Sequence, residues 1–225
     1  MRYEEADCSL CANQRTHWCK LCIRNEDLDD YYQPADSEQV RAMLESELID
    51  KRIEIGLSGE FLKAYAAAKK FTSNNVKLFM PVHAGNNCLT ATDGYALARF
   101  PCDVPSLLEG KNIVCIENGT VMVHSKTLPW QDKKIEELVD AKKSAFLSDL
   151  PEPARKKHLS YGPVVYLSLQ DATVAIREKH YRLVTETLNS RVELRYGDKK
   201  GAVLFKGENG EVAVMPIRKD LLEEE

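Results

Sequence analysis

The feature that most constrains how this chain can fold is a cluster of four cysteines near its start. They form two CxxC pairs separated by seven residues: Cys8, Cys11, Cys19 and Cys22. Two residues between cysteines let both sulfurs of a pair turn toward one ion, and two pairs complete a tetrahedron of thiolates, which suits zinc. The segment around them has few large apolar residues, so it cannot build a core of its own. The pattern therefore predicts a structural Zn²⁺ site that supplies the missing stability.

Other interpretations of this cluster stay open at the level of sequence. His17 lies between the two pairs and could replace one cysteine as a ligand. The same thiolates could hold iron or an iron–sulfur cluster, or form a redox-active dithiol. Because the connecting loop is short, a compact knuckle or small ribbon is expected rather than a long-looped finger.

Composition limits the remaining possibilities. The chain has 225 residues with 44% hydrophobic content, enough for one well-buried core and a small satellite element. Its formal net charge of −4 is not that of a general nucleic-acid binder, although a local basic surface remains compatible with it. No apolar run is long enough to span a bilayer, and residues 1–7 do not resemble a signal peptide. A reducing, cytoplasmic location is therefore expected, with Cys88, Cys102 and Cys115 as buried or inert thiols.

The first fifty residues are expected to form an appendage. Residues 1–35 comprise the zinc module and a polar linker, and residues 36–50 a short connecting helix. Asp36 or Ser37 can cap this helix, and apolar residues then follow at helical spacing.

From residue 51 to about 222 the pattern predicts one α+β domain with two similar halves. Each half consists of a strand, a helix and then several antiparallel strands. In the first half, Ser58 is expected to cap a helix over 59–71, and Asn118-Gly119 is a strong hairpin signal. Residues 103–160 are interpreted as an insertion, with a helix over 129–150 and a basic loop after it. In the second half, a helix is expected from Asp171 to about Leu188, followed by three strands.

Two short motifs in this domain resemble a known family. The segment Ala91-Thr-Asp-Gly-Tyr-Ala-Leu-Ala98 resembles the Ala-Thr-Asp-Gly-His-Arg-Leu-Ala element of bacterial DNA polymerase III β sliding clamps. The segment Glu211-Val-Ala-Val-Met-Pro-Ile-Arg218 resembles the Val-Val-Met-Pro-Met-Arg at the C-terminus of those clamps. The order of elements between the two motifs also fits, and the resemblance covers about three-quarters of the chain.

This resemblance implies a DNA-clamp-like fold and a set of functional residues. In the family, closed rings encircle DNA, helices line the hole, and a hydrophobic pocket receives short peptides from polymerases and other replication proteins. The residues that carry over to this pocket are Thr92, Gly94, Tyr95, Leu97, Val214, Met215, Pro216, Ile217 and Arg218. The lysines expected to face double-stranded DNA, without reading its sequence, are Lys63, Lys69, Lys70 and Lys77.

The chain also departs from the family. Tyr95 and Ala96 stand where clamps usually have His and Arg. The chain has room for one domain where a clamp protomer has three, and in clamps the two motifs come from adjacent domains. A pocket shared by two head-to-tail subunits is therefore expected, and a DNA-encircling homo-oligomer would need about six copies.

The sequence supports a binding protein rather than an enzyme. The histidines show no catalytic spacing, and no Gly-rich phosphate loop, GxSxG or HExxH occurs. Three functions are consistent with the residues. The first is a replication-associated clamp, for which a phage or mobile-element origin would suit the compact size, and the second is a clamp-fold module that binds a replication protein without encircling DNA. In the third, the zinc module itself binds nucleic acid through the basic residues around Trp18, which are Arg15, Lys20 and Arg24.

Overall fold

The computed structural model describes residues 49–72, 80–124, 135, 143–158, 162–170, 172–188, 191–197 and 201–217. The four-cysteine cluster, the linker and residues 36–48 of the expected connecting helix lie outside these ranges, and its last two residues, 49 and 50, are not helical. The description below concerns the α+β body.

The body is built from two helices and short antiparallel strands. Its first part contains β1 (Lys51–Glu54), α3 (Gly59–Lys69), β2 (Val82–Gly85), β3 (Cys88–Thr92), β4 (Ala96–Pro101), β5 (Lys111–Glu117) and β6 (Thr120–His124). Its second part contains β7 (Lys143–Phe146), a 3-10 turn (Leu147–Asp149), β8 (Ala154–His158), β9 (Gly162–Ser168), β10 (Thr173–Arg177), α5 (Glu178–Thr187), β11 (Glu193–Tyr196), β12 (Val203–Lys206) and β13 (Glu211–Val214). The predicted order, a strand, a helix and antiparallel strands, is confirmed for the first half, whereas in the second half four strands precede the helix.

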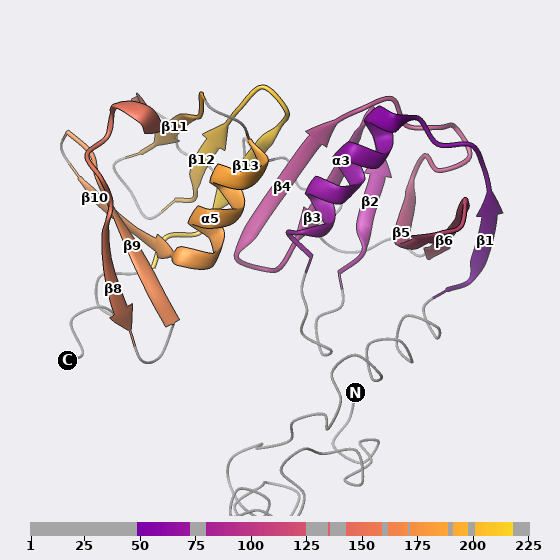
Figure 1. Ribbon diagram of the computed structural model, residues 1–225, viewed down its shortest axis with the longest axis horizontal. Coiled ribbons are helices and arrows are strands. Elements are labelled where there is room, and N and C mark those ends of the chain that lie inside the picture. Colours follow the sequence, from indigo (N-terminus) through magenta and orange to yellow (C-terminus); the bar gives the residue numbers. More distant parts are fainter. Residues whose placement is uncertain are drawn as a thin grey trace, which may run out of the picture.

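The strands form two sheets. A ten-stranded sheet has the order β1-β6-β5-β2-β3-β4-β13-β12-β11-β7, and β8 to β10 form a separate sheet in the order β10-β9-β8. All of these neighbours are antiparallel. Near the middle of the large sheet, β4 of the first half pairs with β13 of the second, and we call this pairing the seam. Helix α3 contacts β2 to β4, and α5 contacts β9 and β10 (Figure 1).

Local signals explain how α3 forms. The Ser58 hydroxyl accepts a hydrogen bond from the backbone N–H of Phe61 at 3.1 Å, so the predicted N-cap is confirmed. Phe61, Tyr65 and Ala68 are buried against the sheet, as their spacing predicts. One continuous core cluster includes side chains from both helices and from both sheets.

The turns follow their residue types. Asn118 and Gly119 have φ values of 48° and 78°, which are the left-handed values that a tight β5–β6 hairpin requires. The β2–β3 turn uses Asn86 and Asn87, with φ values of 53° and 52°. Asparagine tolerates this conformation better than other non-glycine residues.

Three predictions for the second half of the chain are wrong in detail. The helix expected over 129–150 does not extend to its end, because Lys143–Phe146 is strand β7, paired with β11. The expected basic loop after Pro153 contains β8, an edge strand rich in cations. Charged residues commonly protect the edge of a sheet from pairing with other chains. The charged composition that suggested a loop therefore belongs to an edge strand. Residues 173–177 are strand β10, and α5 begins only at Glu178.

The segment interpreted as an insertion contributes to the body. Strands β5 and β6 join the large sheet between β2 and β1. Ile135 is 1% exposed and lies in a small apolar cluster with side chains from both strands of the seam. The other members of that cluster are Leu97, Ala202, Leu204 and Ala213. Part of the expected insertion therefore stabilises the join between the two halves.

Candidate functional site

The two motifs that resemble the clamp family meet at the seam. In the β4–β13 register, Ala96 lies opposite Val214 and Leu97 lies opposite Ala213. One residue beyond β13, the backbone N–H of Met215 donates to the carbonyl of Tyr95 at 2.8 Å. The expectation that two subunits must combine to bring these motifs together is therefore wrong, because the fold of one chain does so. A sequence reading of one domain could not show that β13 returns to pair with β4.

The turn between β3 and β4 is held by its own side chains. The Thr92 hydroxyl donates to the Ala96 carbonyl at 2.7 Å and accepts from the Gly94 N–H at 3.0 Å. One carboxylate oxygen of Asp93 accepts from the N–H groups of Tyr95 and Ala96 at 3.1 and 3.0 Å. Gly94 has a φ of 86°, which glycine adopts at little cost. Thr92-Asp93-Gly94 therefore forms the tight turn that the sequence allowed as its simplest interpretation.

The second carboxylate oxygen of Asp93 reaches across to α5. It lies 2.9 Å from Nζ of Lys179 and 2.8 Å from Nε2 of His180. A carboxylate only accepts hydrogen bonds, so Nε2 of His180 carries the hydrogen. The sequence motif alone gives Asp93 no partner. Its partners are 86 and 87 residues away along the chain, so only the three-dimensional fold reveals them.

The environment of Asp93 keeps it ionised. Burial by itself would raise the pKa of this carboxyl. The hydrogen bond and charge of His180, with those of Lys179, outweigh burial and hold the pKa well below its ordinary value. Both oxygens accept two hydrogen bonds each, which leaves little capacity for proton transfer to a substrate. The arrangement fits a structural link between the motif turn and α5 better than an acid–base catalyst.

Around this link lies an exposed surface that we call the Tyr95–Met215 patch, defined as Tyr95, Met215, Pro216, Ile217 and Arg177. Tyr95 is 49% exposed and Met215 is 47% exposed. The guanidinium carbon of Arg177 lies 3.9 Å from the centre of the Tyr95 ring. The N–H of Ile217 donates to the Ala175 carbonyl at 2.8 Å, so residues 215–217 bridge the Tyr95 turn and strand β10.

The structure separates the residues predicted for the pocket into two groups. Gly94, Tyr95 and Met215 are exposed, and Pro216 and Ile217 are half-buried. Thr92, Leu97 and Val214 are buried: the Thr92 hydroxyl holds the turn, and Val214 packs in the main core. Leu97 belongs to the Ile135 cluster, so its replacement would test packing more than binding. Arg218 lies outside the described residues.

Sequence reasoning missed Arg177, Lys179 and His180. All three fell within the helix expected from Asp171, and no sequence motif assigned any of them a role in the site. The alternation of Val174 and Ile176 with smaller or polar residues was the available signal that a strand precedes α5.

The lysines expected to face DNA have different surroundings. Lys63 is exposed on α3, and Nζ of Lys69 lies 5.8 Å from the centre of the Tyr65 ring. Nζ of Lys70 lies 3.6 Å from a carboxylate oxygen of Glu186 on α5, which shows that the two helices are neighbours. Glu186 also pairs with Arg182 at 3.6 Å. The helical surface thus carries both signs of charge, and Lys77 lies outside the described residues.

Other potential chemistry is sparse in the described part of the chain. There, no group of three or more His, Cys, Asp or Glu side chains is arranged to hold a metal, and the predicted cysteine site is not among these residues. Cys88, Cys102 and Cys115 are buried, as predicted, and burial is the largest cause that raises the pKa of Cys102, to about 11. None of the described helices has the length and apolar character needed to cross a membrane.

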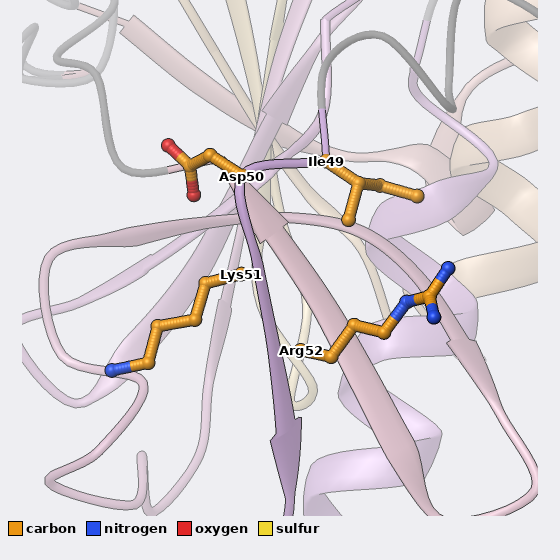
Figure 2. A pocket seen from close by; sticks show the side chains of 4 residues that line it. All are labelled: Ile49, Asp50, Lys51 and Arg52. Carbon is orange, nitrogen blue, oxygen red and sulfur yellow. The ribbon is translucent and has the colours of Figure 1, made fainter.

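A surface hollow of about 390 Å³ lies at the start of β1, lined by Ile49, Asp50, Lys51 and Arg52. Lys51 and Arg52 extend to opposite sides of the strand (Figure 2). Strand β1 is the last strand at one end of the large sheet, whereas the two motifs meet near its middle. The hollow is therefore separate from the Tyr95–Met215 patch.

Comparisons with known proteins were made by sequence and by structure. No protein-family profile and no curated protein matches the sequence. Among solved structures, Caulobacter crescentus pol III beta is similar, with 14% identity and a TM-score of 0.49 over 77% of this chain and 68% of that one. The Bacillus subtilis DNA polymerase sliding clamp has 13% identity and a TM-score of 0.46, over 76% and 66%.

A third similar structure is the Helicobacter pylori beta clamp bound to a DNA ligase peptide. It has 11% identity and a TM-score of 0.39, over 81% of this chain and 63% of that one. The chain therefore spans about two thirds of the length of the clamps that it resembles in structure. At these scores the likeness is one of distant fold, between this α+β body and DNA polymerase III β sliding clamps.

Proposed function

We propose that this chain is a clamp-like, replication-associated protein without enzymatic activity, and that it binds short peptides of partner proteins at the Tyr95–Met215 patch. One observation carries the proposal: the two motifs that resemble the peptide pocket of sliding clamps come together on one surface. Their contact consists of the β4–β13 pairing and the hydrogen bond from Met215 to Tyr95.

The chemistry of the patch suits peptide anchoring. Met215 offers a flexible, polarisable side chain, and Pro216 beside it is rigid. Tyr95 offers a large amphipathic ring, and Tyr and Arg are enriched among the residues that dominate binding energy at interfaces. The Thr92 hydroxyl bonds and the β4–β13 pairing hold the backbone that carries these side chains.

Replacing Met215 by Ala is expected to weaken peptide binding about tenfold, because the side chain is exposed and its loss removes an apolar anchor without opening a core cavity. The probe is the fluorescein-labelled DNA ligase peptide that the Helicobacter pylori clamp binds, titrated by fluorescence anisotropy. Leu107→Ala removes a 60% exposed side chain elsewhere and serves as the matched control. Equal affinities for the wild type and Met215→Ala would rule out the patch as the site.

The proposal extends to assembly around DNA. Strands β1 and β7 end the ten-stranded sheet, so each has one edge without a strand neighbour in the described structure. Pairing of β1 in one copy with β7 in the next would continue the sheet from copy to copy and could close a ring. Light scattering at tens of micromolar protein, with and without duplex DNA, tests this part. A monomer under both conditions would contradict it.

A second function, a clamp-fold module that binds a replication protein without encircling DNA, is favoured by the charges. Both end strands begin with lysine, a residue typical of edges that avoid pairing. On the helices, Lys70 and Arg182 are engaged by Glu186, which reduces the net positive charge available to phosphates. This alternative predicts peptide binding by a monomer.

We further propose that Cys8, Cys11, Cys19 and Cys22 bind one zinc ion, on the evidence of their spacing. Native mass spectrometry should find one zinc per chain and none in a variant with all four cysteines changed to serine. If the zinc module contacts nucleic acid through Arg15, Lys20 and Arg24, the same variant should lose DNA retention in a low-salt gel shift.

A further inference from the structure

The Tyr95–Met215 patch contains one cation, Arg177. No carboxylate in the described structure pairs with it. Its recorded contact is with the Tyr95 ring, at 3.9 Å from the guanidinium carbon to the ring centre. Stacking on an aromatic face leaves the N–H groups at the edge of the guanidinium plane available as donors. Arg177 is half-buried, so the ring also restricts its orientation before any ligand arrives.

The position of Arg177 relative to the apolar residues follows from the backbone. The backbone carbonyl of Ala175 accepts the N–H of Ile217, and Arg177 lies two residues further along the same strand. Tyr95 contacts Arg177 through its ring and Met215 through its carbonyl. Arg177 and Met215 therefore flank Tyr95, and a short peptide could contact both.

The charges around Arg177 are paired with one another, so Arg177 itself supplies the net positive charge of this surface. Lys179 has a 52% exposed side chain, and its partner Asp93 is buried. The neighbouring carboxylate of Glu178 is paired with Arg155 at 3.3 Å. Helix α5 begins directly after Arg177, so the partial positive charge of the helix start has the same sign.

We propose that Arg177 makes the patch selective for acidic peptides, in which a carboxylate side chain lies next to the apolar residue that contacts Met215. The proposal rests on the peptide-binding function above and adds the chemical class of the partner. The guanidinium would form a paired, charge-assisted hydrogen bond to the carboxylate while Tyr95 holds it in position.

Two labelled peptides of equal length test this selectivity. One has the sequence Gly-Ser-Leu-Phe-Glu-Glu-Ser-Gly, and in the other both Glu residues are replaced by Gln. The Glu peptide is expected to bind the wild-type chain about tenfold more tightly in 50 mM salt, with a smaller difference in 500 mM salt. Arg177→Gln should abolish the difference, and Arg177→Lys should retain part of it.

Arg191 provides the matched control. Its guanidinium carbon lies 4.6 Å from the centre of the Phe146 ring, so Arg191→Gln removes the same charge and a similar stacking contact away from the patch. This variant should leave the preference for the Glu peptide unchanged. Thermal unfolding of each variant shows whether the fold is intact.

The outcomes separate this inference from the function on which it rests. If the wild type binds both peptides with equal affinity and Met215→Ala weakens the binding of both, the patch binds peptides but the proposed selectivity for acidic peptides is wrong. The proposed selectivity is also wrong if Arg177→Gln lowers the affinity for both peptides by the same factor. If neither these peptides nor the ligase peptide binds the wild type, the proposed function fails and the inference fails with it.

Discussion

Replacing Asp93 by Ala is expected to lower the free energy of unfolding by about 3 to 5 kcal/mol, since it removes one partner from a buried, charged cluster. The Asp93 side chain is 4% exposed, and His180 beside it is 1% exposed. Without the carboxylate, the Nε2–H of His180 and the backbone N–H groups of Tyr95 and Ala96 lose their acceptor. Urea denaturation followed by circular dichroism measures the effect.

Two variants divide this effect into its parts. Asp93→Asn keeps an oxygen for the backbone N–H groups but removes the charge, so an intermediate loss is expected. Lys179→Gln should cost about 1 kcal/mol or less, because the lysine is 52% exposed and its ion pair is screened by solvent. If Asp93→Ala cost no more than Lys179→Gln, the link between the motif turn and α5 would not be a main stabilising feature.

The same cluster predicts a pH dependence. The pKa of Asp93 is lower in the folded chain than in the unfolded chain, so its ionisation stabilises the fold at pH values above its ordinary pKa of 3.8. That contribution is lost progressively as the pH falls below about 4, towards the pKa of the folded state. Between pH 5 and pH 3, the stability gap between wild type and Asp93→Asn should therefore narrow.

Replacing Gly207 by Ala is expected to destabilise the fold by about 3 kcal/mol, at the upper end of overpacking effects. A Cβ atom at this position would lie 2.1 Å from the backbone oxygen of Leu188 and 2.8 Å from its Cβ. Both atoms are close to the main chain at the end of α5, so neither can move aside by a simple rotation. The turn before β13 and the end of α5 would have to separate.

Gly56→Ala is the matched control, because no atom lies within 4 Å of the Cβ that it would add. It should change the unfolding free energy by less than about 0.5 kcal/mol. Chemical denaturation of both variants under the same conditions makes the comparison. A small effect at Gly207 would mean that the contact between the turn and α5 relaxes readily.

The structural features that were predicted correctly depend on interactions between residues that are close along the chain. Ser58 caps α3 three residues away, and Asn118-Gly119 closes a hairpin between adjacent strands. Strands β7 and β8 were missed because their pairing partners, rather than their own residues, make them strands. The Ile135 cluster also depends on distant strands, which explains why an insertion was expected where the chain completes a core.

The candidate site likewise contains some residues that local motifs predicted and some contacts that they did not. Tyr95 and Met215 were predicted from the two motifs, and the structure places both on one exposed surface. The partners of Asp93 and the stacking of Arg177 on Tyr95 were not predicted. They arise where β10 and α5 of the second half meet the motif turn of the first, a contact that no local pattern encodes.

The seam has a consequence for valency. Because β4 and β13 belong to the same polypeptide, each chain carries a whole Tyr95–Met215 patch, and dilution to the monomer cannot take the patch apart. If the patch binds peptides as proposed, its stoichiometry should be one peptide per chain in the monomer and in any oligomer, whereas a pocket shared between subunits would be lost when they dissociate. An assembly of several copies would therefore differ from one copy in avidity for partners that carry several peptides, and its affinity for a single peptide would be unchanged.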